Sequence, residues 1–283
     1  MKRFDYCRPT DLKEAFSLME KSEGRAKYIA GGTDLLIRIK HRTVEPDTLI
    51  SLRGVDSLRG IAENGAVIIG SMTPFREIER HRGVARNYPA LTRAAWWLAN
   101  PQVRNVATIG GNLCNAAPSA DSAPPLLVTD AMLTLEGPGG ERKVPVEDFF
   151  AGPGETCLDA TEVLTRIEIP KTKPHTGMAF LKLGRVAQDI AVVNAAALLV
   201  AEDGVCRKCR LAVGAVAPVP LRLKDVEEFV EGERIRPELL REVRTMVEGL
   251  VRPITDVRST EEYRRSMSGV LATRAIEQAI KNI

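Results

Sequence analysis

The residues best suited to chemistry gather in one stretch of small residues, from Ala107 to Asp121. Its glycine pair, Gly110-Gly111, has no Cβ atoms, so it can take positive φ and let a large ligand lie against bare main chain. Main-chain N–H groups and a hydroxyl suit phosphates, whereas carboxamides and a carboxylate suit sugar-like hydroxyls. We therefore expect a loop here, rather than a helix or strand, and a ligand with both kinds of group. The short polar side chains that recur along the stretch are Thr108, Asn112, Asn115 and Asp121.

A second glycine pair, Gly31-Gly32, repeats this pattern upstream. Tyr28 to Ala30 is typical of a short buried strand, and Asp34 is placed to cap a helix that begins at Leu35. A strand, a glycine turn and a helix N-terminus together form a site for an anion. One glycine pair alone is more simply a tight turn, but two pairs, each flanked by threonine and short polar residues, favour a bound cofactor.

Other chemistries find less support in the sequence. No Gly-x-Gly-x-x-Gly follows a predicted strand and no Walker loop is present, which argues against a nicotinamide-type Rossmann site and a P-loop. Ser119 and Asp121 have no histidine near them, and an activated serine needs a positioned base. Cys206 and Cys209 form a Cys-x-x-Cys that supplies only half of a tetrahedral metal site. We therefore predict no catalytic side chain and no metal site in this chain.

The composition is that of an ordinary globular protein. The 283 residues are 44% hydrophobic and 27% charged, which allows a sizeable core and two domains. The net charge of +3, without any lysine or arginine tract, argues against nucleic acid as a partner. The longest apolar run, Ile190 to Ala201, is interrupted by Asn194 and is too short to span a membrane. Scattered cysteines and a start without the apolar core of a signal peptide predict a reducing, cytoplasmic location.

Helix and strand signals alternate through the first 170 residues. Asp11 with Glu14 fits the capping pattern of a first helix, and Asn64-Gly65 predicts a hairpin. A helix from Leu91 to Leu98 leads toward the central stretch, with one of Trp96 and Trp97 in the core and the other available to a partner. Further strands are expected at Thr48 to Leu52, Met132 to Leu135 and Val163 to Ile169.

Pro170 to Pro174 is the best domain boundary in the sequence, because two prolines and two lysines in five residues favour an extended, solvated connector. Beyond it, three strands joined by short turns predict an antiparallel sheet, followed by helices. Ser259 with Glu262 is expected to cap the last helix. The expected strands are Met178 to Leu183, Ile190 to Ala201 and Val205 to Val216, and the expected helices are Lys224 to Val230, Pro237 to Leu250 and Thr260 to Ile280.

These motifs together resemble the FAD-binding medium subunit of the molybdenum hydroxylases, the family of xanthine dehydrogenase and carbon monoxide dehydrogenase. The resemblance implies an α+β fold, with a two-part FAD-binding domain of the PCMH, or vanillyl-alcohol-oxidase-like, type in residues 1–172. It implies that residues 173–283 form the C-terminal domain of this flavoprotein subunit, with a three-stranded antiparallel sheet and helices. The matching segments, which follow the family's order over essentially the whole chain, are AGGTDLL, QVRNVATIGGNLCNAAPSADSAPPLL, DIAVVNAAALL, LAVGAVAPVPLR and PITDVRSTEEYRRSMSGVLATRAI.

The resemblance also implies how FAD is held. Residues 29–35 would wrap the pyrophosphate through main-chain N–H groups and the Thr33 hydroxyl, and residues 108–112 would contact phosphate or ribityl oxygens. Lys182 matches a basic position near the flavin, where a cation would favour the anionic reduced ring. Val186 stands where some relatives carry an aromatic residue over the ring. The residues expected to bind FAD are Ile29, Ala30, Gly31, Gly32, Thr33, Asp34, Leu35, Leu98, Thr108, Ile109, Gly110, Gly111, Asn112, Asn115, Asp121, Leu164 and Lys182.

Two kinds of contact within this set differ in chemistry. Asn115 and Asp121 match positions that bond sugar or ribityl hydroxyls. Leu98 and Leu164 match positions that pack near the isoalloxazine, although both are equally well explained as core leucines. Asp34 is assigned to the helix cap, because a carboxylate beside phosphates would repel them.

The function implied is that of a flavoprotein oxidoreductase subunit that transfers electrons. By resemblance, a large molybdopterin subunit and a small subunit with two [2Fe–2S] clusters are its partners, and NAD, a quinone, ferredoxin or oxygen is the external acceptor. Two alternatives stay open at this stage. The chain could be an assembly subunit without flavin, or a free-standing flavin reductase of the type that acts on a cell-wall precursor.

Overall fold

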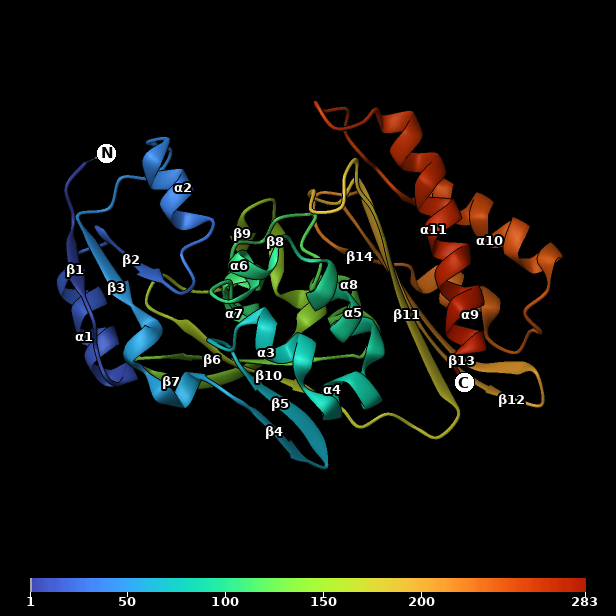
Figure 1. The fold of residues 1–283 in the computed structure, drawn as a ribbon, viewed down its shortest axis with the longest axis horizontal. Helices are drawn as coiled ribbons and strands as arrows, with labels where there is room; N and C mark the ends of the chain where they lie inside the picture. Colours follow the sequence, from blue (N-terminus) through green and yellow to red (C-terminus); the bar gives the residue numbers. More distant parts are fainter. Residues whose placement is uncertain (1) are drawn as a thin grey trace.

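A computed structural model, which describes residues 2–283, confirms a fold of mixed helices and sheets (Figure 1). The chain begins with a small parallel sheet in which β3 (Thr48–Ser51) lies between β1 (Asp5–Cys7) and β2 (Ala26–Ile29). α1 (Leu12–Lys21) and α2 (Leu35–Lys40) lie between these strands in sequence. The carboxylate of Asp11 accepts a hydrogen bond from the N–H of Glu14 at 2.8 Å, so the predicted cap of α1 is confirmed.

A second, antiparallel sheet has the strand order β4-β5-β10-β6-β7. Gly65, with φ of +73°, joins the first two strands in the predicted hairpin. The strands are β4 (Ile61–Asn64), β5 (Ala66–Gly70), β6 (Met132–Gly137), β7 (Gly140–Pro145) and β10 (Val163–Ile169), and a separate pair is formed by β8 (Phe150–Gly152) and β9 (Glu155–Thr156).

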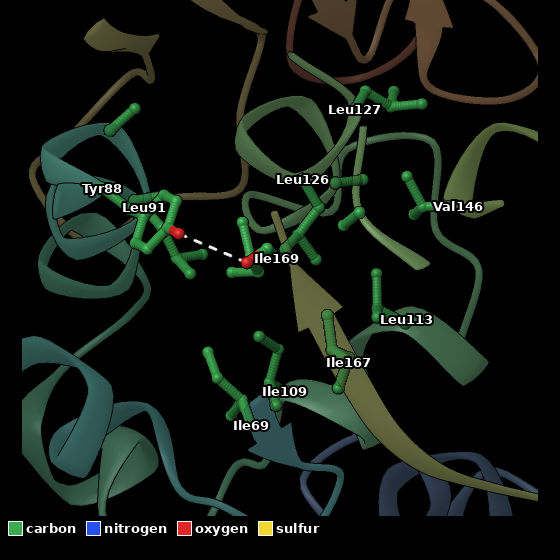
Figure 2. Packing of buried hydrophobic residues seen from close by; sticks show 14 of the residues in the cluster. Ile69, Tyr88, Leu91, Ile109, Leu113, Leu126, Leu127, Val146, Ile167 and Ile169 are labelled. Atoms are coloured by element: carbon green, nitrogen blue, oxygen red, sulfur yellow. Dashed lines mark hydrogen bonds between the residues drawn. The ribbon is translucent and has the colours of Figure 1, made fainter. Parts of the chain in front are cut away.

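Short helices fill the space between this sheet and the C-terminal sheet. Figure 2 shows part of their apolar core, where the Tyr88 hydroxyl donates to the carbonyl of Ile169 at 3.2 Å. Trp97 packs against this core and Trp96 is 48% exposed, as expected for one tryptophan inside and one outside. The helices are α3 (Phe75–Arg80), α4 (Arg82–Asn87), α5 (Pro89–Trp97), α6 (Pro101–Arg104), α7 (Ile109–Cys114) and α8 (Ala123–Val128).

The C-terminal sheet contains the three long antiparallel strands that the sequence predicts, β11 (Thr176–Leu183), β12 (Val193–Glu202) and β13 (Val205–Gly214). A short fourth strand, β14 (Leu221–Arg222), extends the sheet at its edge. β12 starts three residues later than the predicted Ile190, although the N–H of Val192 already donates to the carbonyl of Leu183 at 2.8 Å.

Both faces of the C-terminal sheet are covered (Figure 1). Ala196, Leu198 and Val200 of β12 pack into the core that this sheet shares with residues before 172. The alternate residues Ala195, Ala197 and Leu199 pack toward the C-terminal helices. Since successive side chains of a strand point to opposite faces, a strand buried on both faces has a continuous apolar sequence.

The C-terminal helices are α9 (Lys224–Val230), α10 (Pro237–Leu250) and α11 (Glu261–Lys281), and the bounds of the first two are those predicted. The predicted cap of the last helix is wrong. Thr260, not Ser259, caps α11, with its hydroxyl accepting from the N–H of Tyr263 at 3.2 Å. Ser259 instead pairs through its backbone with Asp256 in the preceding turn.

Candidate cofactor-binding site

A cleft of about 620 Å³ lies between the two glycine pairs and the near end of the C-terminal sheet. Its volume is within the range of roughly 300–1,000 Å³ typical of small-molecule and cofactor sites. Most of the residues expected to bind a cofactor line it, although they come from distant parts of the chain. Those residues are Ala30, Gly31, Gly32, Thr33, Asp34, Leu35, Leu98, Thr108, Gly110, Gly111, Asn112, Asn115, Asp121, Leu164 and Lys182.

Ile29 and Ile109 were expected in the site but do not line the cleft. Ile29 ends β2 and is 7% exposed, and Ile109 is fully buried at the start of α7. Both side chains belong to hydrophobic clusters. Each side chain therefore anchors the glycine pair next to it in the core.

The first glycine pair opens a run of available main-chain donors. Gly32 has φ of +78°, and none of the hydrogen bonds formed within residues 2–283 uses the N–H groups of residues 32–35. Asp34 precedes α2, but its carboxylate makes no capping bond and instead accepts from the Thr33 hydroxyl at 3.3 Å, so the predicted side-chain cap is wrong. Consecutive free amides at a glycine turn form a concave site for an anion.

The second glycine pair is not the expected loop, because Gly110 and Gly111 lie inside the short helix α7. Thr108 caps this helix, and its hydroxyl accepts from the N–H of Gly111 at 3.1 Å. The N–H of Gly110 donates to the carbonyl of Ser71 at 2.9 Å. Neither glycine has positive φ, so that part of the prediction is wrong, although both glycines line the cleft without a Cβ atom.

A buried ion pair forms part of the cleft wall. The Nζ of Lys182 lies 2.6 Å from Oδ2 of Asp121, and the Nδ2 of Asn194 donates to Oδ1 of Asp121 at 2.9 Å. Burial raises the pKa of the Asp121 carboxyl above its ordinary value, and the ammonium of Lys182 and the amide of Asn194 oppose that rise. The predicted cation at Lys182 is thus compensated by a carboxylate within the protein.

The apolar wall contains Leu98 and Leu164, which are 9% and 3% exposed. Ala99, next to Leu98, has a positive φ of +40°. The guanidinium of Arg104 holds this turn by donating to the carbonyls of Leu98 at 3.0 Å and Ala99 at 2.9 Å. Such a non-glycine conformation persists where neighbouring groups fix it.

Sequence reasoning missed two residues that shape the site. Arg104 gave no signal, because its partners are main-chain carbonyls and Glu79, which lies 25 residues away. Asn194 did give a signal in the sequence, because it is the only polar residue in the apolar run from Val192 to Ala201. A buried amide in such a run implies a polar partner.

Three residues singled out in the sequence, Cys206, Cys209 and Val186, do not line the cleft. No group of three or more potential metal ligands occurs in residues 2–283, and both Cys206 and Cys209 are fully buried in β13. Val186 is 70% exposed beside the segment that leads to the cleft. None of the helices in the described part of the chain is long and apolar enough to cross a membrane.

Family comparisons match almost the whole chain. Residues 2–172 match the family described as the FAD binding domain in molybdopterin dehydrogenase, and residues 178–279 match the CO dehydrogenase flavoprotein C-terminal domain. The xanthine dehydrogenase FAD-binding subunit of Escherichia coli O157:H7 is 36% identical over 97% of this chain and 95% of its own length. The carbon monoxide dehydrogenase medium chain of Hydrogenophaga pseudoflava is 33% identical over 98% of this chain and 97% of its own.

Solved structures agree with these sequence matches. A chain of carbon monoxide dehydrogenase from Hydrogenophaga pseudoflava superposes with a TM-score of 0.97 and 33% identity, covering 99% of this chain and 98% of that chain. A chain of quinoline 2-oxidoreductase from Pseudomonas putida 86 gives a TM-score of 0.94 and 30% identity, with 99% of both chains covered.

Proposed function

The chain belongs to the family of FAD-binding medium subunits of the molybdenum hydroxylases, and from that premise we propose that it is the electron-transfer subunit of such a complex. A large molybdopterin subunit and a small iron–sulfur subunit would be its partners, with its FAD connecting [2Fe–2S] clusters to an external acceptor. We further propose that residues 1–172 and 173–283 act as two domains, consistent with the extents of the two family matches.

The observation that carries this proposal is the run of free amides on residues 32–35, which line the cleft. Four successive donors suit the pyrophosphate of a dinucleotide, because N–H groups at a glycine turn and a helix N-terminus stabilise its negative charge. The second glycine pair lies in α7, where the N–H groups of the lining residues are already bonded. These residues would therefore contact the cofactor through their side chains. We therefore assign the phosphates to the first glycine pair.

The other lining residues suit a flavin ring. Leu98 and Leu164 offer apolar surface that excludes water, and the Lys182–Asp121 pair supplies hydrogen-bonding groups without net charge. Bound FAD supplies the redox chemistry, because a flavin exchanges electrons singly or as a hydride. The protein's part is to bind it, orient it and adjust its electrostatic surroundings.

A direct test is to purify the full chain, remove any ligand and titrate it with FAD. We expect a yellow complex with one FAD per chain, released when the protein is denatured. A protein that stays colourless would contradict FAD binding and favour the assembly subunit. Substitution of Gly111 by leucine should fill space in the cleft and abolish binding, whereas the same change at the open turn residue Gly139 should leave it intact.

The partners need a separate test. Co-expression with subunits of the molybdopterin and iron–sulfur types should give a complex in which substrate reduces the FAD. Reduction of bound FAD by a nicotinamide cofactor with turnover of a substrate in the isolated chain would instead favour a free-standing reductase. The cytoplasmic location and the identity of the acceptor stay predictions.

A further inference from the structure

A row of three residues crosses the C-terminal sheet at the end that meets the cleft. Lys182 on β11 pairs with Asn194 on β12, and Asn194 pairs with Gly214 on β13. Along their strands, Lys182 and Asn194 fall on the same face as Phe180 and Ala196, which pack in the core shared with residues before 172. The row therefore faces Asp121 and not the C-terminal helices.

Asn194 touches the ion pair but not the cleft. Its side chain is completely buried, and it is not among the residues that line the cleft. Its Nδ2 donates to one oxygen of Asp121, while Lys182 donates to the other. Each carboxylate oxygen is thus held by a donor from a different strand.

The orientation of the Asn194 amide is set by Asp121. The Oδ1 of Asn194 has no hydrogen-bond partner within residues 2–283, so no other group selects which way the amide faces. Turning the amide over would place its oxygen against the carboxylate, which would repel it. The observed orientation leaves one buried oxygen unbonded in order to keep the donor on Asp121.

Gly214 limits the same amide from the other side. A Cβ atom at Gly214 would overlap with Oδ1 of Asn194 and would lie 3.2 Å from the carbonyl oxygen of Pro118. That carbonyl accepts from the N–H of Ala215 at 2.7 Å. The end of β13 therefore fixes both the amide and the segment that carries Asp121.

We propose that Asn194 is a positioning residue of the flavin site, which fixes the Asp121 carboxylate against Lys182 so that the cleft presents a neutral ion pair. This inference rests on the proposed function, because it assumes that FAD occupies the cleft. Without the amide, one oxygen of Asp121 would be buried without a donor, which disfavours its charge. Lys182 would then be less compensated, and a more positive site favours the reduced flavin.

The test is Asn194→Leu in the full chain, with the midpoint potential of bound FAD as the main readout. Leucine has the same branched shape and the same number of heavy atoms as asparagine, and it removes the unbonded oxygen, so the fold should be retained. We expect a more positive midpoint potential while FAD binding is retained, because Asn194 does not line the cleft and acts only through Asp121. In an Asp121→Asn background the same substitution should add no further shift, because the two residues act as one unit.

Thr129→Val is the matched control. Thr129 is also buried, and its hydroxyl donates to the carbonyls of Pro125 and Leu126 away from the cleft. Its loss should lower stability without moving the potential. A potential shift of equal size in Asn194→Leu and Thr129→Val would mean a general structural effect and would overturn the proposal.

Two outcomes separate this inference from the function on which it rests. If the wild-type chain takes up no FAD, the proposed function itself fails. If the wild type binds FAD and Asn194→Leu keeps the wild-type potential, only the positioning role is wrong. Should Asn194→Leu fail to fold, Gly214→Ala displaces the amide while keeping every polar group, and an unchanged potential in that variant overturns the role equally.

Discussion

The two Gly-Gly pairs both line the cleft, but they differ in how many main-chain N–H groups they leave free. After Gly31-Gly32, the N–H groups of residues 32–35 take no part in hydrogen bonds within residues 2–283. Around Gly110-Gly111, every N–H from residue 109 to 112 is already bonded, to Thr73, Ser71 or Thr108. The first pair therefore leaves donors available for the proposed pyrophosphate, whereas the second belongs to a packed helix that brings polar side chains to the cleft.

The members of each pair also differ from one another. Gly31 and Gly110 lie in close contact with Val106 and Ser71 respectively, so neither position has room for a Cβ atom. Gly32 is the one with positive φ, and Gly111 meets only the hydroxyl of its own cap residue closely. Single alanine substitutions should therefore lower the free energy of unfolding by different amounts at the four glycines, according to whether close packing or positive φ requires the glycine.

The largest effect is expected for Gly31→Ala. The added Cβ would overlap with the carbonyl oxygen of Val106 and lie 2.9 Å from the Cα of Ala107, so backbone would have to move. Such overpacking should lower the free energy of unfolding by about 3 kcal/mol or more, measured by urea denaturation. Since Val106 leads into α7, FAD binding should weaken as well. A loss below about 1 kcal/mol would show that the two glycine segments are not held in contact.

Gly110→Ala should come second. Its Cβ would lie 2.6 Å from the Cβ of Ser71 and 2.7 Å from the carbonyl oxygen of Ser71, but alanine also favours the helix. The overpacking of about 3 kcal/mol and the helix gain of about 1 kcal/mol predict a net loss of about 2 kcal/mol. Gly249→Ala in α10 is the matched control, because no atom outside the local helix lies within 4 Å of its Cβ position. That variant should gain stability, by about 0.5–1 kcal/mol.

The fold was largely predictable because its signals are local. The bounds of α9 and α10 follow from apolar spacing and from Pro237 at a helix start, and both match the structure. The helix α7 was not predictable, because two glycines in six residues give it poor intrinsic propensity. It forms since Thr108 caps it and the carbonyls of Ser71 and Thr73 accept its first N–H groups.

The site was predictable only in part, for the same reason. The family resemblance assigned the glycine pairs, Asp121 and Lys182 to one FAD site, and in the structure all of them line one cleft. That Asp121 and Lys182 neutralise each other could not be read from a pattern, because 61 residues separate them. Asn194 was visible as a polar interruption, but its partner lies 73 residues away.

Gly32→Ala should have the third effect. With φ of +78°, alanine would be strained, and the side chains of Leu36 and Ile29 would have to yield at 3.1 and 3.2 Å. We expect a loss of about 1–2 kcal/mol in the free energy of unfolding. Gly32→Asn is the sharper comparison, because asparagine tolerates this conformation better and should lose less. Equal losses in both variants would mean that packing, not φ, requires the glycine.

Gly111→Ala should have the smallest effect on stability, so it separates the effect on FAD binding from the effect on folding. Its Cβ would lie 2.9 Å from the hydroxyl oxygen of Thr108, so the cap would rotate away at a cost of about 1 kcal/mol. Alanine's helix propensity returns about the same amount, so the free energy of unfolding without FAD should change by less than about 0.5 kcal/mol. FAD affinity should nevertheless fall, because Gly111 and Thr108 both line the cleft.

Thr108→Val is the control for this variant. It loses the cap without adding a Cβ at residue 111, and it should lower the free energy of unfolding by about 1 kcal/mol. If Gly111→Ala bound FAD as tightly as the wild type, the second glycine pair would serve the packing of α7 alone, and the contrast with the first pair would be complete.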